Sequence, residues 1–258
     1  MSRTIAVTGS ASGIGAALVR ILEARGDRVI TVDRVEADLV VDLASAEGRV
    51  AAVAGITERC DGVLDGLVTC AGTSVPSPLM VEVNYAGTVE LVEGLQPALA
   101  ASEAGRVAVV GSISGTQPND PELVDLLLAG RTAAATDRAA ALVEQGAPTR
   151  IYPSTKAAIA RWARTTCIAP GWADAGVPLN VIAPGVILTP MSAGLVDDPR
   201  MRAVMDAAVP MPLNGYAEPE APAELLAWLV SEANSHVTGQ VIYVDGGAEA
   251  TLRPAEHY

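Results

Sequence analysis

A tyrosine and a lysine four residues apart, Tyr152 and Lys156, have the types and spacing needed for proton transfer. Helix positions i and i+4 share a face, so both side chains can point into one cleft. Pro153 suits the first turn of such a helix and leaves Tyr152 at its entrance. A free tyrosine has a pKa of about 10, and a nearby ammonium favours the phenolate and lowers that pKa. We therefore expect Tyr152 to act as a general acid or base.

A serine after an earlier apolar run could complete this pair. Ser112 lies in the segment GSISG, directly after RVAVV. If that run is a strand, a hydroxyl at its carboxyl end can hydrogen-bond a substrate oxygen as charge develops on it. Serine after a strand is otherwise usually a turn former. Together with Tyr152 and Lys156, Ser112 indicates acid–base chemistry on an alcohol or a ketone. Ser114, two residues further, is a candidate substrate contact.

A glycine-rich segment, TGSASGIG at residues 8–15, follows the first apolar run. Glycine allows a tight turn and lets the backbone approach a diphosphate at a helix N-terminus, where free amides attract negative charge. An apolar helical pattern follows the segment, which is the context that a dinucleotide site requires. The residues expected to contact the cofactor are Gly9, Ser12, Gly13, Ile14 and Gly15.

An acidic residue, Asp33, ends the second apolar run. A carboxylate at this place binds the adenosine ribose hydroxyls of a dinucleotide. It would repel the 2′-phosphate of NADP, so we expect NAD as the cofactor. Arg34 beside it could weaken this discrimination.

The elements that must position these residues alternate along the chain. Short runs rich in β-branched residues are separated by longer segments rich in alanine and leucine. The runs are TIAVTG, DRVITVD, ADLVVDL, DGLVTCAG, RVAVVGS, LNVIAPG and QVIYVDGG. Continuous apolar strands separated by helices predict a parallel sheet covered on both faces. We expect one Rossmann-like, doubly wound α/β domain of about seven strands over residues 1–258.

A helical insertion is expected over residues 116–151, between the fifth strand and the helix of Tyr152. In NDPELVDLLLAG, Asn119 or Asp120 can cap a helix and Pro121 suits its first position. A second helix is expected at roughly 132–145.

A second irregular segment, residues 188–222, is rich in proline and contains four of the six methionines. It is too long for an ordinary connection, so we expect a lid. Methionine is flexible and polarisable and suits bulky apolar ligands such as a steroid, a terpenoid or an aromatic ketone. Alternatively, these methionines pack an amphipathic lid helix onto the domain. The candidate substrate contacts in this segment are Met191, Leu195, Met201 and Met205.

The composition excludes several partners. The formal net charge of −13 repels phosphate backbones, so nucleic acid and anionic membranes are poor partners. The sequence has no basic-then-apolar leader and no uncharged run long enough to span a bilayer. Three dispersed cysteines indicate a reducing compartment. Apart from these cysteines, only His236 and His257 could add soft metal ligands, and none of these residues is clustered, so we expect no metal site. The reduced cysteines and the absence of a leader together lead us to expect a cytoplasmic protein.

The spacing G-x3-G-x-G after a threonine resembles the short-chain dehydrogenase/reductase family. Ser112, Tyr152 and Lys156 match the family's catalytic serine, tyrosine and lysine. Asn84, in VEVNYAGT, matches the asparagine that holds a water on the catalytic lysine, although it could instead be a polar kink in an apolar helix. The resemblance implies an NAD-dependent oxidoreductase that interconverts a secondary alcohol and a ketone by hydride transfer. Lys156 could also hydrogen-bond the nicotinamide ribose.

Three further segments resemble cofactor contacts of the same family. Asp42 and Leu43 resemble its adenine contact. Cys70-Ala71-Gly72 resembles its N-A-G turn, with Cys70 in place of the usual asparagine. APGVILTPM resembles its P-G segment, which implies nicotinamide and diphosphate contacts for the last group of residues. These are Pro184, Ile187 and Thr189.

One departure narrows the resemblance. Ser112 and Tyr152 are separated by 40 positions, much more than in most family members, and this length looks like the bacterial 3α-hydroxysteroid dehydrogenase/carbonyl reductases. Stretches such as DLASAEGR, VNYAGTVEL and GLVDDPR are similar to that group. The resemblance implies a homodimer or homotetramer, and the insertion favours the dimer.

Two other functions stay open. Extended relatives use the same turn and Tyr–Lys pair for sugar epimerisation or dehydration, but they usually carry a longer carboxyl-terminal substrate domain. A non-catalytic NAD(P)-sensing protein typically loses the tyrosine or the lysine, and both are present here.

Overall fold

A computed structural model describes residues 2–253 and residue 255. In this part of the chain, seven parallel strands form one sheet in the order β3-β2-β1-β4-β5-β6-β7. The strands are β1 (Thr4–Thr8), β2 (Arg28–Asp33), β3 (Leu39–Val40), β4 (Gly66–Thr69), β5 (Val107–Val110), β6 (Leu179–Pro184) and β7 (Val241–Val244). Each lies within one of the seven predicted runs, so the predicted Rossmann-like sheet is confirmed. Strand order reverses beside β1, and ligands bind beyond the carboxyl ends of strands at such a switch point.

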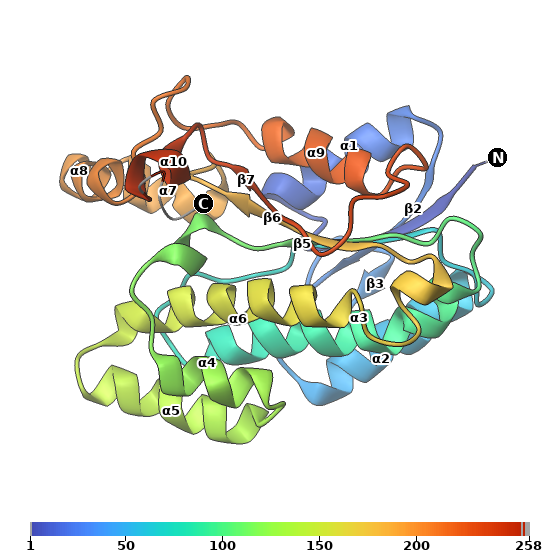
Figure 1. Cartoon of the computed structure of the whole chain (residues 1–258), viewed down its shortest axis with the longest axis horizontal. Coiled ribbons are helices and arrows are strands. Elements are labelled where there is room, and N and C mark those ends of the chain that lie inside the picture. Colours follow the sequence, from blue (N-terminus) through green and yellow to red (C-terminus); the bar gives the residue numbers. More distant parts are fainter. Residues whose placement is uncertain (1, 254, 256–258) are drawn as a thin grey trace.

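Helices cover both faces of the sheet (Figure 1). On one face lie α1 (Gly13–Ala24) and α9 (Glu220–Leu229), which pack on each other. On the other face lie α2 (Ala46–Arg59), α3 (Gly87–Ala100) and α6 (Ile151–Thr166). Strands covered on both sides are typically near-continuous apolar runs, and all positions of β4 and β6 are indeed buried.

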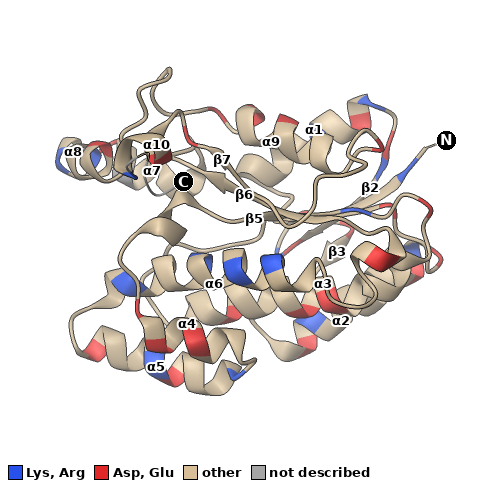
Figure 2. Cartoon of the chain, viewed as in Figure 1, with Lys and Arg blue, Asp and Glu red and all other residues tan. Residues whose placement is uncertain are grey.

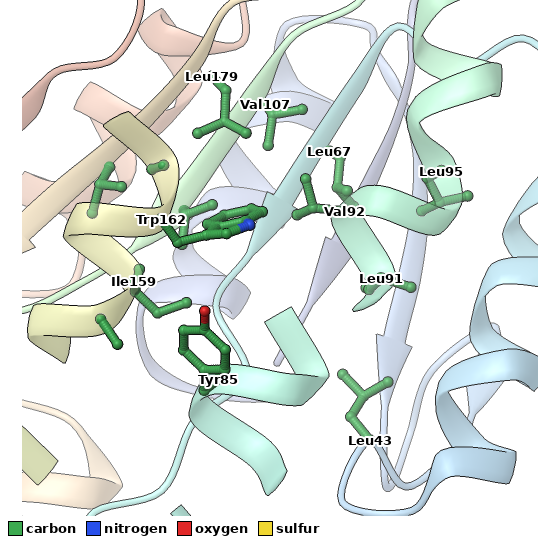
Figure 3. Close-up of a cluster of buried hydrophobic side chains, with 14 of the residues drawn as sticks. Leu43, Leu67, Tyr85, Leu91, Val92, Leu95, Val107, Ile159, Trp162 and Leu179 are labelled. Atoms are coloured by element: carbon green, nitrogen blue, oxygen red, sulfur yellow. The ribbon is translucent and has the colours of Figure 1, made fainter. Parts of the chain in front are cut away.

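Helix α6 is held firmly in the core between β5, β6 and α3. Trp162 and Ile159 of α6 lie among Leu179, Val107 and Val92 in a buried cluster (Figure 3). The indole Nε1 of Trp162 also donates a hydrogen bond to Glu93 Oε1 at 3.2 Å. Large apolar side chains packed in this way fix the helix that carries Tyr152.

The insertion forms two helices, α4 (Pro121–Leu128) and α5 (Thr132–Glu144), that lie beneath α6 (Figure 1). Asp120 is the N-cap of α4, with its carboxylate accepting a hydrogen bond from the Leu123 amide at 2.8 Å. Of the two residues predicted as the cap, the structure therefore selects Asp120. A 3-10 turn, η3 (Pro148–Arg150), joins the insertion to α6.

The expected lid contains two helices, α7 (Pro190–Val196) and α8 (Pro199–Ala208), at the end of the molecule to which the strands point (Figure 1). Helix α9 begins at Glu220 and packs on α1. Its first residues, up to the predicted lid boundary at 222, therefore belong to a core layer. The last described helix is α10 (Ala248–Leu252).

Charged residues of both signs are interspersed over the outer helices (Figure 2). In the part of the chain that the structure describes, no helix is long and apolar enough to cross a bilayer. Over the same residues, the structure contains no group of three or more His, Cys, Asp or Glu side chains that could hold a metal ion. His257, named above, lies outside the described residues.

Candidate active site

A cavity of about 710 Å³ opens at the carboxyl ends of the strands. It brings together residues from nearly every segment that the sequence singled out. The predicted cofactor contacts that line it are Gly9, Ser12, Gly13, Ile14, Gly15, Asp33, Asp42, Leu43, Ala71, Gly72, Pro184, Ile187 and Thr189. The predicted catalytic and substrate residues that line it are Ser112, Tyr152, Lys156, Ser114, Met191 and Met205.

The glycine-rich turn forms the floor of this cavity. Gly9 has φ +64°, and a Cβ there would lie 2.7 Å from the backbone nitrogen of Ala71. A Cβ on Gly15 would overlap the carbonyl oxygen of Gly9. Only glycine allows this packing, and it leaves the first-turn amides of α1 beside the cavity. Such a helix terminus is suited to a diphosphate.

A carboxylate closes one end of the cavity. Asp33 Oδ2 accepts a hydrogen bond from the Ala11 amide at 3.0 Å, and Oδ1 accepts one from the Arg34 amide at 2.6 Å. These bonds fix the charge at the end of β2, beside the cavity-lining Asp42 and Leu43. The turn and the carboxylate together fit a dinucleotide without a 2′-phosphate.

Three of the four predicted catalytic residues meet on the wall of the cavity. Ser112 has extended backbone at the end of β5 and hydrogen-bonds the Tyr152 phenol. Lys156 Nζ lies 5.6 Å from the centroid of the Tyr152 ring. The same Nζ donates a hydrogen bond to the carbonyl oxygen of Val110 at 2.9 Å. The strand that positions Ser112 therefore also anchors the lysine, a contact that sequence reasoning missed because it involves a backbone atom.

The pKa of Tyr152 differs from the expectation. Burial raises the pKa of this phenol, and the hydrogen bond from Ser112 only partly opposes the increase. The predicted lowering of the Tyr152 pKa is therefore wrong, because burial is the dominant effect on this phenol. Burial also lowers the pKa of Lys156 to about 8, because desolvation disfavours the charged form of both groups.

Asn84 lies in a π-helix, η1 (Val81–Ala86), and does not line the cavity. Its Oδ1 accepts a hydrogen bond from the Thr73 amide at 2.8 Å, and its Nδ2 donates one to the Thr73 carbonyl at 3.0 Å. The side chain therefore holds the loop after β4 against η1. Its predicted contact with Lys156 through a water stays a prediction.

The segment after β6 reaches back to the glycine turn. A Cβ on Gly13 would lie 3.1 Å from Thr189 Cγ2, so the two segments are in close contact. Thr189 also forms a capping box with Ser192 at the start of α7. The predicted cofactor contacts in the glycine turn and in the segment after β6 therefore form one surface, although they lie far apart in the sequence.

The substrate end of the cavity lies between the lid and the insertion. Met191 and Met205 line it, whereas Met201, 39% exposed on α8, does not. The predicted substrate contact at Met201 is therefore not supported, and the side chain of Leu195 lies outside the described part. Sequence reasoning missed Gln117, whose Nε2 donates a hydrogen bond to the Ala208 carbonyl at 3.2 Å. Gln117 follows Ser112 and Ser114 closely in the sequence, and this position was the signal from which it could have been predicted as a residue of the site.

Comparison with known proteins identifies the family. Residues 3–122 match the family model described as "short chain dehydrogenase", and residues 129–249 match the model described as "Enoyl-(Acyl carrier protein) reductase". The 3-alpha-hydroxysteroid dehydrogenase/carbonyl reductase of Comamonas testosteroni is 36% identical, over 98% of each chain. This chain belongs to the short-chain dehydrogenase/reductase family. As a family member it is an oxidoreductase, as the resemblance of its motifs implied.

Two further relatives extend this result. The cis-4-hydroxycyclohexanecarboxylate dehydrogenase of Sinomonas cyclohexanicum is 32% identical, over 96% of this chain and 97% of that protein. The crystal structure of the 3-alpha-hydroxysteroid dehydrogenase from Pseudomonas sp. B-0831, complexed with NADH, is 42% identical with a TM-score of 0.89. The match covers 97% of this chain and 98% of the Pseudomonas chain. The similarity therefore extends through the helical insertion and the lid.

Proposed function

We propose that this short-chain oxidoreductase interconverts a bulky, apolar secondary alcohol and the corresponding ketone, with NAD as its cofactor. The observation on which this depends is that Ser112, Tyr152 and Lys156 line the same cavity as the glycine turn and Asp33. Acid–base groups and a dinucleotide site must share one cavity if a proton and a hydride are to leave the same carbinol. The relatives named as hydroxysteroid dehydrogenases support the proposal.

The cofactor residues fit NAD in two ways. The first turn of α1 offers free amides to the diphosphate, and Asp33 offers a carboxylate to the ribose hydroxyls. The NADH in the 42% identical Pseudomonas structure supports this choice. A bound nicotinamide would supply the hydride acceptor for oxidation of the alcohol and the hydride donor for reduction of the ketone. Pro184, Ile187 and Thr189 line the cavity and would contact the nicotinamide carboxamide and the diphosphate.

The protein's own residues would move the proton. In ketone reduction, Tyr152 donates its phenolic proton to the substrate oxygen, and the raised pKa keeps that proton in place near neutrality. In alcohol oxidation, the ionised phenol accepts the hydroxyl proton. Ser112 hydrogen-bonds the same substrate oxygen, and the Lys156 ammonium favours the ionised phenol.

The walls of the substrate end support a bulky apolar substrate. Besides Met191 and Met205, apolar residues from the lid and from two other segments line the cavity. These include Leu79, Met80, Val83, Pro148 and Val209. The names of two relatives, a hydroxysteroid dehydrogenase and a hydroxycyclohexanecarboxylate dehydrogenase, describe ring-bearing secondary alcohols. We infer an alicyclic or polycyclic substrate.

We also infer a homodimer in the cytoplasm. Helix α4 packs directly on α6, so the insertion covers a helix face through which family members commonly form tetramers. The free thiols of Cys60, Cys70 and Cys167 agree with a reducing compartment. Light scattering should give the mass of a dimer, and a tetramer at working concentration would contradict this part.

Oxidation of an alcohol panel tests the function. The purified protein is given NAD with androsterone-like steroids, monoterpene alcohols or small polar hydroxy acids, and NADH formation is followed by absorbance. We expect turnover of the steroids or terpenoids and little of the acids. Activity on the acids alone would exclude the apolar substrate, and equal activity with NADP would exclude the cofactor assignment. Redox-neutral conversion of a nucleotide sugar would indicate an epimerase, and cofactor binding without turnover a sensor.

A further inference from the structure

A buried serine connects the insertion to the catalytic helix. Ser154 is fully buried in α6, two residues from both Tyr152 and Lys156. Its Oγ donates a hydrogen bond to the Arg150 carbonyl at 2.7 Å and accepts one from the Asp120 amide at 2.9 Å. Residues two apart on a helix do not share a face, so Ser154 points toward the insertion while the catalytic pair points into the cavity. The start of α4 is thus fastened to the first turn of α6.

Asp120, at this junction, is itself held by α5. Arg138 donates through Nε to Asp120 Oδ1 at 3.0 Å and through Nη2 to Oδ2 at 2.6 Å. Such a bidentate guanidinium–carboxylate contact fixes the orientation of the two side chains as well as the distance between them. The hydrogen bond from Arg138 is the largest cause that lowers the pKa of Asp120, so the carboxylate stays ionised near neutrality. Asp120 is buried, whereas Arg138 is partly exposed.

Helix α5 has a second polar contact with the catalytic region. Thr136 Oγ1 donates to Glu82 Oε1 at 2.9 Å. Glu82 lies in η1, two residues before Asn84, and its other oxygen lies 3.2 Å from Arg49 Nη1. Through Glu82 and Asp120, Thr136 and Arg138 therefore connect α5 to two of the three segments that carry predicted catalytic residues, η1 and α6. The insertion therefore supports the segments around the catalytic centre and is not merely an addition to the surface.

We infer that the Asp120–Arg138 pair positions Tyr152, by holding the first turn of α6 through Ser154. This inference rests on the proposed function, because it assigns the pair a role in that reaction. The pair lies on the far side of α6 from the cavity and does not line it. It acts through the helix, so it is a positioning pair. A small displacement of a catalytic group reduces turnover far more than it reduces cofactor binding.

Mild variants of the pair test this inference. Asp120→Ala removes the helix cap and could prevent folding, so Asp120→Asn, which can still cap α4, is the main variant. Arg138→Lys keeps the positive charge but cannot form the bidentate contact with Asp120, whereas Arg138→Gln removes both the charge and the bidentate contact. Glu220→Gln is the control, because it breaks an exposed ion pair with Arg20 far from the cavity. Each variant is compared for kcat, for KM of NAD and for the pH profile of kcat.

We expect Asp120→Asn and Arg138→Gln to lower kcat about tenfold, with KM for NAD unchanged and the pH profile of kcat displaced. Arg138→Lys should recover part of the loss, and Asp120→Asn/Arg138→Gln should be no worse than either single variant, because the two side chains act as a unit. Glu220→Gln should match the wild type. An unchanged kcat and pH profile, or equal losses in all variants and the control, would overturn the inference.

Hydrogen exchange separates this inference from the proposed function. In Asp120→Asn, amides of residues 151–157 should exchange faster than in the wild type, while those of α9 should be unchanged. This measurement needs no turnover. If the wild type oxidises no alcohol, the proposed function fails and exchange alone decides whether the pair holds α6. Unchanged exchange at 151–157 would overturn the inference even in an active enzyme.

Discussion

The two walls of the cavity differ in how firmly they are held. On the catalytic wall, α6 is packed on the sheet and braced by the insertion, and Ser154, Thr155 and Lys156 are all buried. On the lid wall, none of the described residues of α8 is buried, and Met191 of α7 is 47% exposed. The hydrogen bond from Gln117 to the Ala208 carbonyl joins the lid to the insertion.

This difference indicates that the catalytic wall carries out the proton transfer and that the lid wall determines which substrate binds. Proton transfer requires catalytic groups held within a fraction of an ångström, which rigid packing provides. Binding a bulky apolar substrate requires a surface that adapts, which flexible methionines on a weakly packed lid provide. Changes to the catalytic wall should therefore reduce kcat, whereas changes to the lid should mainly raise KM for the substrate.

The largest effect is expected from Tyr152→Phe, which keeps the ring and removes the proton. Because general acid–base catalysis contributes about 10²–10⁴-fold, kcat should fall on the order of 10³-fold. Binding of NADH, measured by fluorescence titration, should stay within a few-fold of the wild type. If kcat fell less than tenfold, Tyr152 would not be the acid or base.

A smaller effect is expected at the cofactor end from Asp33→Asn. The amide is a weaker acceptor for ribose hydroxyls and no longer repels a 2′-phosphate, so kcat/KM should fall about tenfold with NAD and rise with NADP. Asp27→Asn, before the other end of β2, is the matched control and should behave as the wild type. An unchanged ratio of NAD to NADP activity in Asp33→Asn would show that another residue selects the cofactor.

The lid contact should show the opposite kinetic pattern. Gln117→Ala removes the hydrogen bond to the Ala208 carbonyl, a loss of about 1 kcal/mol for a typical bond. We expect KM for a bulky ketone to rise about fivefold, with KM for NADH unchanged. Steady-state kinetics with both substrates varied would check this, and a fall in kcat alone would place Gln117 on the catalytic wall.

A pair of methionine variants tests which part of the lid faces the substrate. Met205 lines the cavity and Met201 does not, although they lie one helical turn apart on α8. Met205→Ala should raise KM for a bulky ketone about threefold because apolar contact is lost. Met201→Ala should leave KM unchanged. Equal effects from the two variants would mean that the whole of α8 closes over the substrate.

The smallest effect concerns stability. Burial lowers the pKa of Lys156 in the folded protein to about 8, from the ordinary value of 10.5. Between these pH values the unfolded chain binds a proton that the folded chain releases, so the free energy of unfolding should rise with pH. Lys156→Met should lack this rise. Denaturant unfolding between pH 8 and 9, below the ordinary pKa of a cysteine thiol, measures the difference. Parallel slopes for the two proteins would contradict it.

Local patterns were enough to predict much of the fold and the site. The seven strands, the insertion helices and the glycine turn each have a short-range signal, such as Pro121 after a capping residue. The environment of Tyr152 has no such signal, because burial by distant segments determines its pKa. The Asp120–Arg138 brace and the anchoring of Lys156 on the Val110 carbonyl also depend on tertiary packing. Met201 and Met205 are chemically alike, and only the orientation of α8 distinguishes them.

The most direct test of the central claim follows the hydrogen that leaves the alcohol. An alicyclic secondary alcohol that carries deuterium on the carbinol carbon is oxidised with NAD, and the reduced cofactor is analysed by mass spectrometry. We predict that the deuterium is found on the cofactor, and that Tyr152→Phe nearly abolishes this transfer while still binding NAD. Loss of the deuterium to water, or equal transfer by the wild type and Tyr152→Phe, would contradict hydride transfer assisted by Tyr152.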